Sequence, residues 1–110
     1  MDNTIFGNDN DIPWTDLGQG VQRKVMVYND ELMVVKVRFE AGSVGELHQH
    51  PHVQTSYVSK GKFSYIIDGE ERILERGDVC IVPSGRLHGC TCIEAGELID
   101  SFTPYRQDFV

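Results

Sequence analysis

A chain of 110 residues has the length of one small domain, and we expect a single domain over 1–110. Its formal net charge of −7, without a basic cluster, argues against nucleic acid and anionic membranes as partners. The longest aliphatic stretch, 32–35, is far shorter than the roughly 18 residues of a membrane span. Residues 1–4 lack the basic and apolar regions of a signal peptide, so we expect a cytoplasmic location.

Many short apolar runs, punctuated by turn residues and without sustained helical periodicity, predict an all-β fold. Asp68-Gly69 predicts a tight hairpin, and we expect further turns around Gly61 and at Ala95-Gly96 that separate neighbouring strands. This density of strands favours a small double-sheet jelly-roll barrel. In chain order the predicted strands are 24–28, 32–39, 53–59, 62–67, 71–74, 79–82, 89–94 and 97–103.

The chain divides into three expected regions: an N-terminal arm at 1–20, the barrel at 21–103 and a C-terminal tail at 104–110. Residues 12–14 (Ile-Pro-Trp) are predicted to anchor the arm onto the barrel or onto a partner subunit. Alternate residues of the strand at 32–39 form one apolar face. Four cationic residues of the first two strands either line a binding site or lie on solvated strand faces: Arg23, Lys24, Lys36 and Arg38.

Histidines are the most informative residues, because three of the four lie within 48–52 and the fourth is His88. Residues two apart in a strand point to the same face, so His48 and His50 can share one metal ion. Gln54 can return as a ligand on the adjoining strand, although an amide oxygen is a weak, neutral donor. The alternative is a solvated histidine-rich loop with an unrelated His88.

The three cysteines are an odd number, and we expect no disulfide. Cys90 and Cys92 share the strand parity of His88. One of them is therefore an alternative metal ligand. The other possibility is that both pack as small apolar side chains. Cys80 is predicted to lie in the core. His52 follows a proline and is a poor ligand, so we expect it at the rim of the site or behind the ligands.

The C-terminal segment places Leu98, Asp100 and Phe102 on one strand face. If that face looks into the barrel, Asp100 brings a carboxylate close to the metal, where it can act as a general acid or base. Arg106 can offer a bidentate fork to a substrate carboxylate at the barrel mouth. Alternatively, Asp100 pairs with a nearby Arg or Lys, and Arg106 lies on a solvated tail.

Both histidine-containing segments resemble the two signature motifs of the cupin superfamily, small β-barrels that hold a divalent metal. The whole chain resembles, more narrowly, the KdgF family of small cupins from pectin and alginate degradation. The opening and closing segments of the chain restrict the resemblance from the whole cupin superfamily to the KdgF family. The residues that carry it are Gly42, His48, His50, Gln54 and Gly61, then Gly77, Pro83, Gly85 and His88, with Pro13-Trp14, Asp16-Leu17-Gly18, Gly20-Val21, Arg23-Lys24-Val25, Asp100, Phe102, Pro104, Arg106 and Asp108-Phe109.

Cupins commonly carry Glu where this chain has Gln54, and the KdgF family is similar to this chain in using Gln. The resemblance implies one divalent transition metal ion, which is Ni, Zn, Fe or Mn. The residues that it implies as metal ligands are His48, His50, Gln54 and His88. It also implies a substrate site lined by Asp100, Phe102 and Arg106, with Asp100 as the catalytic residue.

The implied activity is that of an isomerase-type metalloenzyme. It would open the ring of a 4,5-unsaturated uronate monosaccharide and ketonise the resulting enol to a linear 4-deoxy-5-keto-uronate. Small cupins often dimerise through their sheets, so we expect a homodimer by analogy. Two alternatives stay open, a metal-dependent cupin dioxygenase and a non-catalytic sugar-binding cupin.

Overall fold

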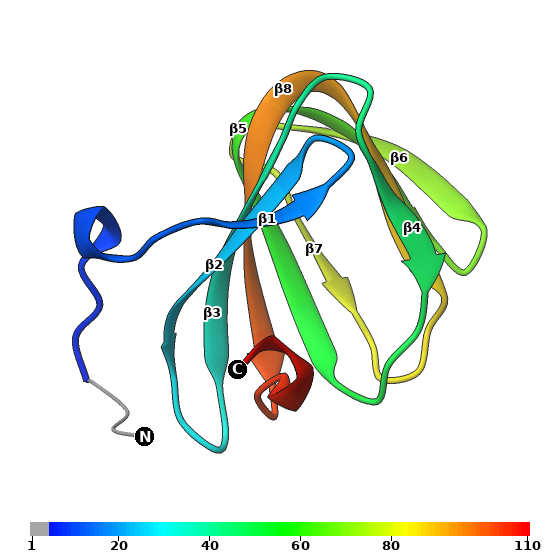
Figure 1. Cartoon of the computed structure of the whole chain (residues 1–110). Helices are drawn as coiled ribbons and strands as arrows, with labels where there is room; N and C mark the ends of the chain where they lie inside the picture. Colours follow the sequence, from blue (N-terminus) through cyan, green and yellow to red (C-terminus); the bar gives the residue numbers. More distant parts are fainter. Residues whose placement is uncertain (1–4) are drawn as a thin grey trace.

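Eight strands form one antiparallel, strongly bent sheet in the computed structural model, which describes residues 5–110. The sheet wraps into an open barrel, and the last residues lie beside its lower end (Figure 1). The predicted all-β jelly-roll fold is confirmed. The elements in chain order are η1 (Asp9–Asp11), β1 (Thr15–Gly18), β2 (Val21–Tyr28), β3 (Met33–Phe39), β4 (Val44–His48), β5 (Val53–Ile67), β6 (Glu70–Glu75), β7 (Val79–Val82), β8 (His88–Thr103) and η2 (Gln107–Phe109).

Strands β5 and β8 are the centre of the barrel and pair with each other along almost their full lengths. The first part of β5 also pairs with β7, and its second part pairs with β6. Strand β8 pairs with β4 near its start and with β3 near its end. Each long strand therefore belongs to both faces of the barrel, which gives the double-sheet arrangement.

The turns predicted around Gly61 and at Ala95-Gly96 are wrong, because β5 and β8 run through both positions. The pairing register shifts between Val58 and Phe63, so the strands bend together while they stay paired. A Cβ atom at Gly61 would lie 2.5 Å from the backbone oxygen of Glu94. These glycines therefore allow two backbones to approach closely, and they do not end the strands.

Two observed strands, β1 and β4, were not predicted from the sequence. Both lie at an edge of the sheet and have mostly exposed side chains, so they lack an alternating apolar pattern. The hairpin at Asp68-Gly69 is confirmed: both residues have positive φ angles, 50° and 83°, and Ile67 pairs directly with Glu70.

The core consists of two clusters of buried side chains. The smaller one contains Met33, Val35 and Phe102, and Phe109 of the tail packs on Phe102 with ring centroids 5.6 Å apart. The apolar face predicted for 32–39 is thus confirmed. The larger cluster contains Phe39, Val58, Phe63, Tyr65, Val82, Cys92 and Leu98.

The N-terminal arm is attached to the barrel by Trp14 and Lys24. The Trp14 ring contacts two cations, with its centre 4.6 Å from Lys24 Nζ and 4.2 Å from the guanidinium carbon of Arg38. Lys24 is buried, and its ammonium group lies 2.5 Å from Asp9 Oδ1. Trp14 therefore anchors the arm onto the barrel, which is the first of the two alternatives expected for residues 12–14. Within residues 5–110, no helix is long and apolar enough to cross a membrane.

Candidate metal and substrate site

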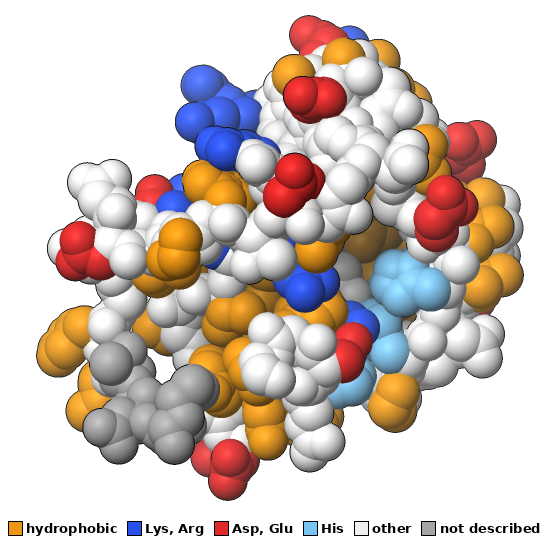
Figure 2. Space-filling view, viewed as in Figure 1, with side chains coloured by type: hydrophobic (Ala, Val, Ile, Leu, Met, Phe, Trp, Pro, Cys, Tyr) orange, Lys and Arg blue, Asp and Glu red, His pale blue; other side chains and the backbone are white. Residues whose placement is uncertain are grey.

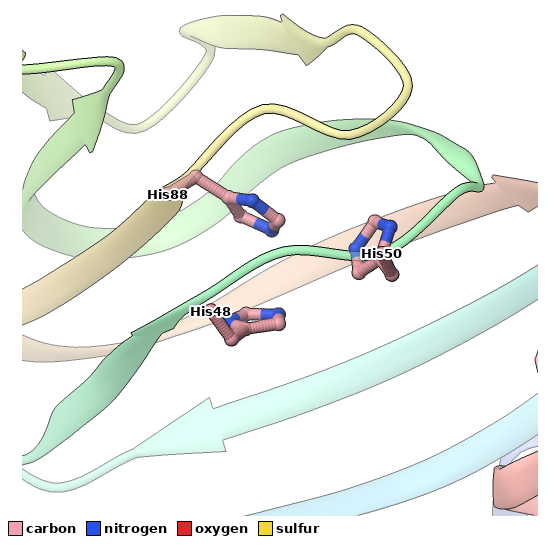
Figure 3. Close-up of side chains that lie close together, drawn as sticks. All are labelled: His48, His50 and His88. Atoms are coloured by element: carbon pink, nitrogen blue, oxygen red, sulfur yellow. The ribbon is translucent and has the colours of Figure 1, made fainter.

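Three histidines from different parts of the barrel converge at one point. His48 ends β4 and pairs in register with His88, the first residue of β8, and His50 lies in the loop between β4 and β5. One ring nitrogen from each lies within 4.8 Å of the others. Figure 3 shows the three rings turned toward a common centre. The strand pairing thus brings together residues that lie 40 positions apart in the sequence (88 minus 48).

The orientation of each ring is held by a backbone carbonyl. A carbonyl can only accept a hydrogen bond, so the Nδ1 atom of each ring carries the proton and Nε2 keeps a free lone pair. Histidine ligands of metals are held in the same way, by a hydrogen bond on the nitrogen that does not bind the ion. The pairs are His48 with Glu46 at 2.8 Å, His50 with His52 at 3.1 Å, and His88 with Arg86 at 2.9 Å.

His88 Nε2 is buried and has no hydrogen-bond partner within the described part of the chain. Burial lowers the pKa of His88 to about 4, and burial also lowers the pKa of His50, so both rings are neutral near pH 7. Since a buried lone pair without a partner is costly, the site is suited to a cation. The triad could therefore hold a divalent metal ion of the kind that prefers imidazole nitrogen.

Gln54 lies beside the triad on β5 and is buried. Its Oε1 atom lies 2.9 Å from Nε2 of His50. Because His50 Nδ1 carries the proton, the lone pair of His50 Nε2 faces a lone pair of Gln54 Oε1. A cation bound by both atoms would remove the repulsion between these lone pairs. The amide oxygen predicted as the fourth ligand thus lies at the site, whereas among residues 5–110 no cysteine sulfur belongs to the cluster.

Asp100 projects from β8 into the barrel and is only 7% exposed. Its Oδ1 atom accepts a hydrogen bond of 2.7 Å from Ser56 Oγ. Burial raises the pKa of Asp100 to about 7, against the opposing effects of the Ser56 hydrogen bond and the positive charge of Arg106. The alternative of a direct ion pair with Arg or Lys is not seen among the described residues. The carboxyl group can therefore hold or release a proton near neutral pH.

A cavity of about 350 Å³ is lined by His48, Gln54 and Asp100 together. Figure 2 shows histidine side chains in a recess of the surface, next to basic side chains and an acidic one. The cavity also receives Arg23 of β2, one of the cationic residues for which the sequence left two readings open. The polar and aromatic residues that line it are His48, Gln54, Asp100, Phe102, Arg106, Arg23, Asp108, Phe39 and Phe109.

Arg106 turns back toward the barrel instead of lying on a solvated tail, and its side chain is 12% exposed. Its Nε and terminal nitrogen donate to the two carboxylate oxygens of Asp108, at 3.1 and 2.9 Å. The guanidinium carbon lies 5.1 Å from the Phe102 ring centre and 4.3 Å from that of Phe109. The predicted fork is therefore present at the cavity, with Asp108 as its partner.

Arg23 is the second cation of the cavity and lies 3.7 Å above the Phe109 ring. Burial lowers its pKa, and so does the positive charge of Arg106, whereas Asp108 raises it. Strand parity between Val21 and Val25 was the sequence signal for an inward side chain. Lys24 points the other way and is bonded to Asp9, so it does not line the cavity.

The structure also shows where His52 and the three cysteines lie. His52 donates from Nε2 to the Tyr105 carbonyl at 3.2 Å, and its ring packs on that of His50 at 5.3 Å, so it lies behind the ligands. The three cysteines are free, as predicted. Cys92 is buried in the larger core cluster, against which Cys80 and Cys90 pack.

Comparisons with known proteins agree with this arrangement. The cupin domain family model matches residues 35–101. The pectin degradation protein KdgF of Dickeya dadantii is 42% identical over 104 residues, which cover 93% of this chain and 94% of that protein. Among solved structures, an RmlC-like cupin from Shewanella frigidimarina matches with a TM-score of 0.95 and 40% identity, over 97% of this chain and 96% of that one. KdgF from Halomonas sp. matches with a TM-score of 0.92 and 37% identity, over 96% and 99%.

The family model covers both histidine motifs, and the relatives cover more than nine tenths of the chain. Since the likeness extends over nearly the full chain, the resemblance predicted from the sequence is confirmed, and the protein belongs to the cupin family and, within it, to the KdgF family of small cupins.

Proposed function

We propose that this protein is a metal-dependent isomerase that opens and ketonises 4,5-unsaturated uronate monosaccharides, giving linear 4-deoxy-5-keto-uronates. One observation carries the proposal: a single cavity is lined by two of the proposed ligands, His48 and Gln54, by a carboxyl group with a pKa of about 7, and by two guanidinium groups. The relative from Dickeya dadantii is a pectin degradation protein, and uronates are the sugars of pectin. The proposed substrate is therefore an anionic sugar with the size of one ring.

The reaction needs no oxidant and no second substrate. The bond between C1 and the ring oxygen breaks, C1 becomes an aldehyde, and the ring oxygen becomes an enol oxygen on C5. A proton then adds to C4 and the enol becomes a ketone. The C1 hydroxyl loses one proton and C4 gains one, so the product is an isomer of the substrate. The catalyst must therefore stabilise charge on an oxygen and deliver a proton to carbon.

The residues proposed to hold the ion are His48, His50, Gln54 and His88. A bound divalent ion would supply Lewis-acid stabilisation of negative charge on a substrate oxygen. Asp100 is the proposed proton donor to C4. Because its pKa is about 7, a large fraction of this carboxyl carries a proton at neutral pH, and its conjugate base is stabilised by the hydrogen bond from Ser56.

The cationic side chains have the proposed task of binding the C6 carboxylate of the sugar. The protein has a net charge of −7, so an anionic substrate needs a local positive field. Arg106 and Arg23 both line the cavity and provide it. Arg106 would exchange part of its contact with Asp108 for the substrate carboxylate. Phe102 would contribute an apolar surface beside the sugar ring.

Proton NMR tests this proposal directly. Purified, metal-loaded protein is mixed with lyase-derived 4,5-unsaturated galacturonate, and the C4 vinyl signal is followed against a protein-free control and a chelator-treated sample. We expect faster loss of the vinyl signal, with keto-uronate signals appearing and with suppression by the chelator. Decay at the protein-free rate, in a sample shown to contain metal, contradicts the proposal.

The role of Asp100 has its own test. Asp100→Asn keeps the size of the side chain but removes its proton-donating acid. We expect it to abolish turnover and to leave metal content unchanged. The matched control is Asp30→Asn in the exposed turn between β2 and β3, which should retain full activity. Turnover by Asp100→Asn at the wild-type rate would remove this carboxyl from the mechanism.

The two alternative functions predict different results in the same samples. A dioxygenase consumes oxygen in proportion to substrate loss, which an oxygen electrode measures. A non-catalytic sugar-binding cupin binds the unsaturated uronate in calorimetry but leaves the vinyl signal at the protein-free rate. The charged lining of the cavity favours an anionic sugar over an apolar substrate of an oxygenase.

A further inference from the structure

Ser56 and Tyr65 form a buried pair of hydroxyl groups between Gln54 and Asp100. Ser56 is 0% exposed and Tyr65 is 5% exposed. Their oxygen atoms lie 2.9 Å apart. Both residues come from β5, on either side of its bend. The pair contacts Gln54 on one side and Asp100 on the other, and neither hydroxyl belongs to the proposed ligands or to the proposed proton donor.

When Asp100 is ionised, the direction of every hydrogen bond in this group follows from counting protons. The carboxylate form of Asp100 can only accept, so Ser56 gives it the single hydroxyl proton at 2.7 Å. Ser56 Oγ then accepts from Tyr65 at 2.9 Å and from Gln54 Nε2 at 3.1 Å. Tyr65 has donated its proton, so it accepts the second amide proton of Gln54 at 3.4 Å.

This proton count fixes the orientation of the Gln54 amide. Only the NH₂ group can satisfy two acceptors, so the nitrogen faces Ser56 and Tyr65. The oxygen must then face the opposite way, which is where His50 Nε2 lies 2.9 Å from it. Rotating the amide by half a turn would aim its oxygen at two hydroxyls whose protons are already engaged, so both hydrogen bonds from Gln54 to Ser56 and Tyr65 would be lost.

We propose that Ser56 and Tyr65 are the positioning residues of the metal site, which hold the Gln54 amide so that its oxygen faces the histidines. This inference rests on the proposed function, in which Gln54 is a ligand. The same Ser56 proton is donated to Asp100, so one buried network connects the fourth ligand to the proton donor. Outer hydrogen-bond partners of metal ligands typically change metal affinity by about 10–100-fold when they are removed.

The hydroxyl pair also explains why this site suits Gln rather than Glu. A carboxylate at position 54 would present acceptors where Ser56 and Tyr65 need donors. Only two hydroxyl protons would then serve Glu at this position and Asp100 together. The two carboxylates would also lie on either side of one serine hydroxyl, and like charges at such short range disfavour each other. The network therefore favours a neutral amide at position 54.

A double-mutant cycle on metal binding tests the inference without using catalysis. Co²⁺ is the probe, and calorimetry gives its affinity while the visible absorption of the bound ion reports its ligand set. We expect Ser56→Ala and Tyr65→Phe each to weaken Co²⁺ binding at least about tenfold and to shift the absorption bands. In a Gln54→Ala background, neither substitution should change the affinity by more than about twofold, because the ligand that they position is gone.

Matched controls come from the same strand. Ser64→Ala removes a hydroxyl that bonds to Glu71 outside the barrel, and Tyr57→Phe removes one from a side chain that is 45% exposed. Both should bind Co²⁺ as the wild-type protein does. Thermal unfolding of every variant shows which are folded. If Ser56→Ala does not fold, the double-mutant cycle is made with Tyr65→Phe and Gln54→Ala alone.

Two results overturn the inference: Co²⁺ affinity that neither substitution changes, or equal weakening with and without Gln54, which would make the pair a merely structural one. Failure of the proposed function gives a different result from failure of this inference. A wild-type protein that shows the expected cycle but leaves the unsaturated uronate unconverted supports the positioning role and refutes the proposed reaction. A wild-type protein that binds no Co²⁺ overturns both.

Discussion

Replacing Asp100 with Asn should change how the stability of the metal-free protein depends on pH. Burial raises the pKa of this carboxyl from 3.8 to about 7 in the folded state, whereas the unfolded chain restores the lower value. Between these two values the folded protein binds a proton that the unfolded chain has released. The Asp100 contribution to stability is therefore fully present below about pH 4 and is lost as the pH rises through about 7.

The magnitude follows from the size of the pKa change. Each tenfold change in proton affinity corresponds to about 1.4 kcal/mol, so the ionised carboxyl costs the folded state on the order of 4 kcal/mol above pH 7. Asn cannot ionise and does not carry this cost. We therefore expect the free energy of unfolding of Asp100→Asn, relative to wild type, to rise by roughly that amount between pH 4 and pH 8.

Urea unfolding of chelator-treated wild type and Asp100→Asn, followed by circular dichroism at several pH values, measures this difference. Other groups that titrate, including His88, are present in both proteins and cancel in the comparison. Asp30→Asn is the control for an exposed carboxyl, and its difference from wild type should stay constant. A flat difference for Asp100→Asn would refute the reasoning that burial raises the pKa. A difference that falls with pH would show that the carboxylate form is stabilised instead.

Three further predictions address the substrate site, the core and the thiols. Arg106→Ala should raise KM for the unsaturated uronate about 10–100-fold, as expected for a lost charged hydrogen bond, with the exposed Arg72→Ala as control; an unchanged KM in the vinyl NMR assay contradicts the role. Phe63→Ala should lower the free energy of unfolding by about 3–5 kcal/mol, because Phe63 is 0% exposed in the larger core cluster; a loss below about 1 kcal/mol in urea would be inconsistent with this packing. Burial raises the pKa of Cys80 to about 11 and that of Cys90 to about 12, so native protein should react slowly with a thiol reagent at pH 8 and all three cysteines should react in urea; rapid reaction of the native protein would show that these thiols are accessible.

Burial disfavours the charged forms of two histidines and of the carboxyl group of this site. Burial lowers the pKa of His50 and His88, and the Nδ1 atoms of all three ligand histidines are bonded to backbone carbonyls. Asp100 is also buried, which makes its charged form costly and keeps a proton available near neutral pH. The same low-dielectric interior therefore prepares the ligand set for a cation and the carboxyl for proton transfer.

Several features of the fold could be predicted because they depend on short stretches of sequence. The hairpin at Asp68-Gly69 follows from two adjacent residues that accept positive φ angles. The buried face from Met33 to Phe39 follows from the alternation of side chains along a strand. The exposed edge strands β1 and β4 lack that alternation, so no local pattern indicated them.

Glycines show the limit of local reasoning most clearly. Gly61 and Gly96 have the composition of turns, and the sequence predicted that the strands end there. In the structure each lies inside a long strand, where another backbone passes too close for a side chain. A glycine marks both a turn and a close approach, and only the position of the paired strand distinguishes them.

The sequence by itself determined the fold class and the residues with the chemistry of a metal site, because side-chain parity and turn chemistry act over a few neighbouring residues, and the resemblance of its motifs indicated the family. Tertiary structure alone decided the rest. It brought Arg23 into the same cavity as Arg106, and it placed Ser56 and Tyr65 between Gln54 and Asp100. The proton state of a buried carboxyl and the direction of an amide depend on which groups surround them, and those groups come from strands that lie far apart in the chain.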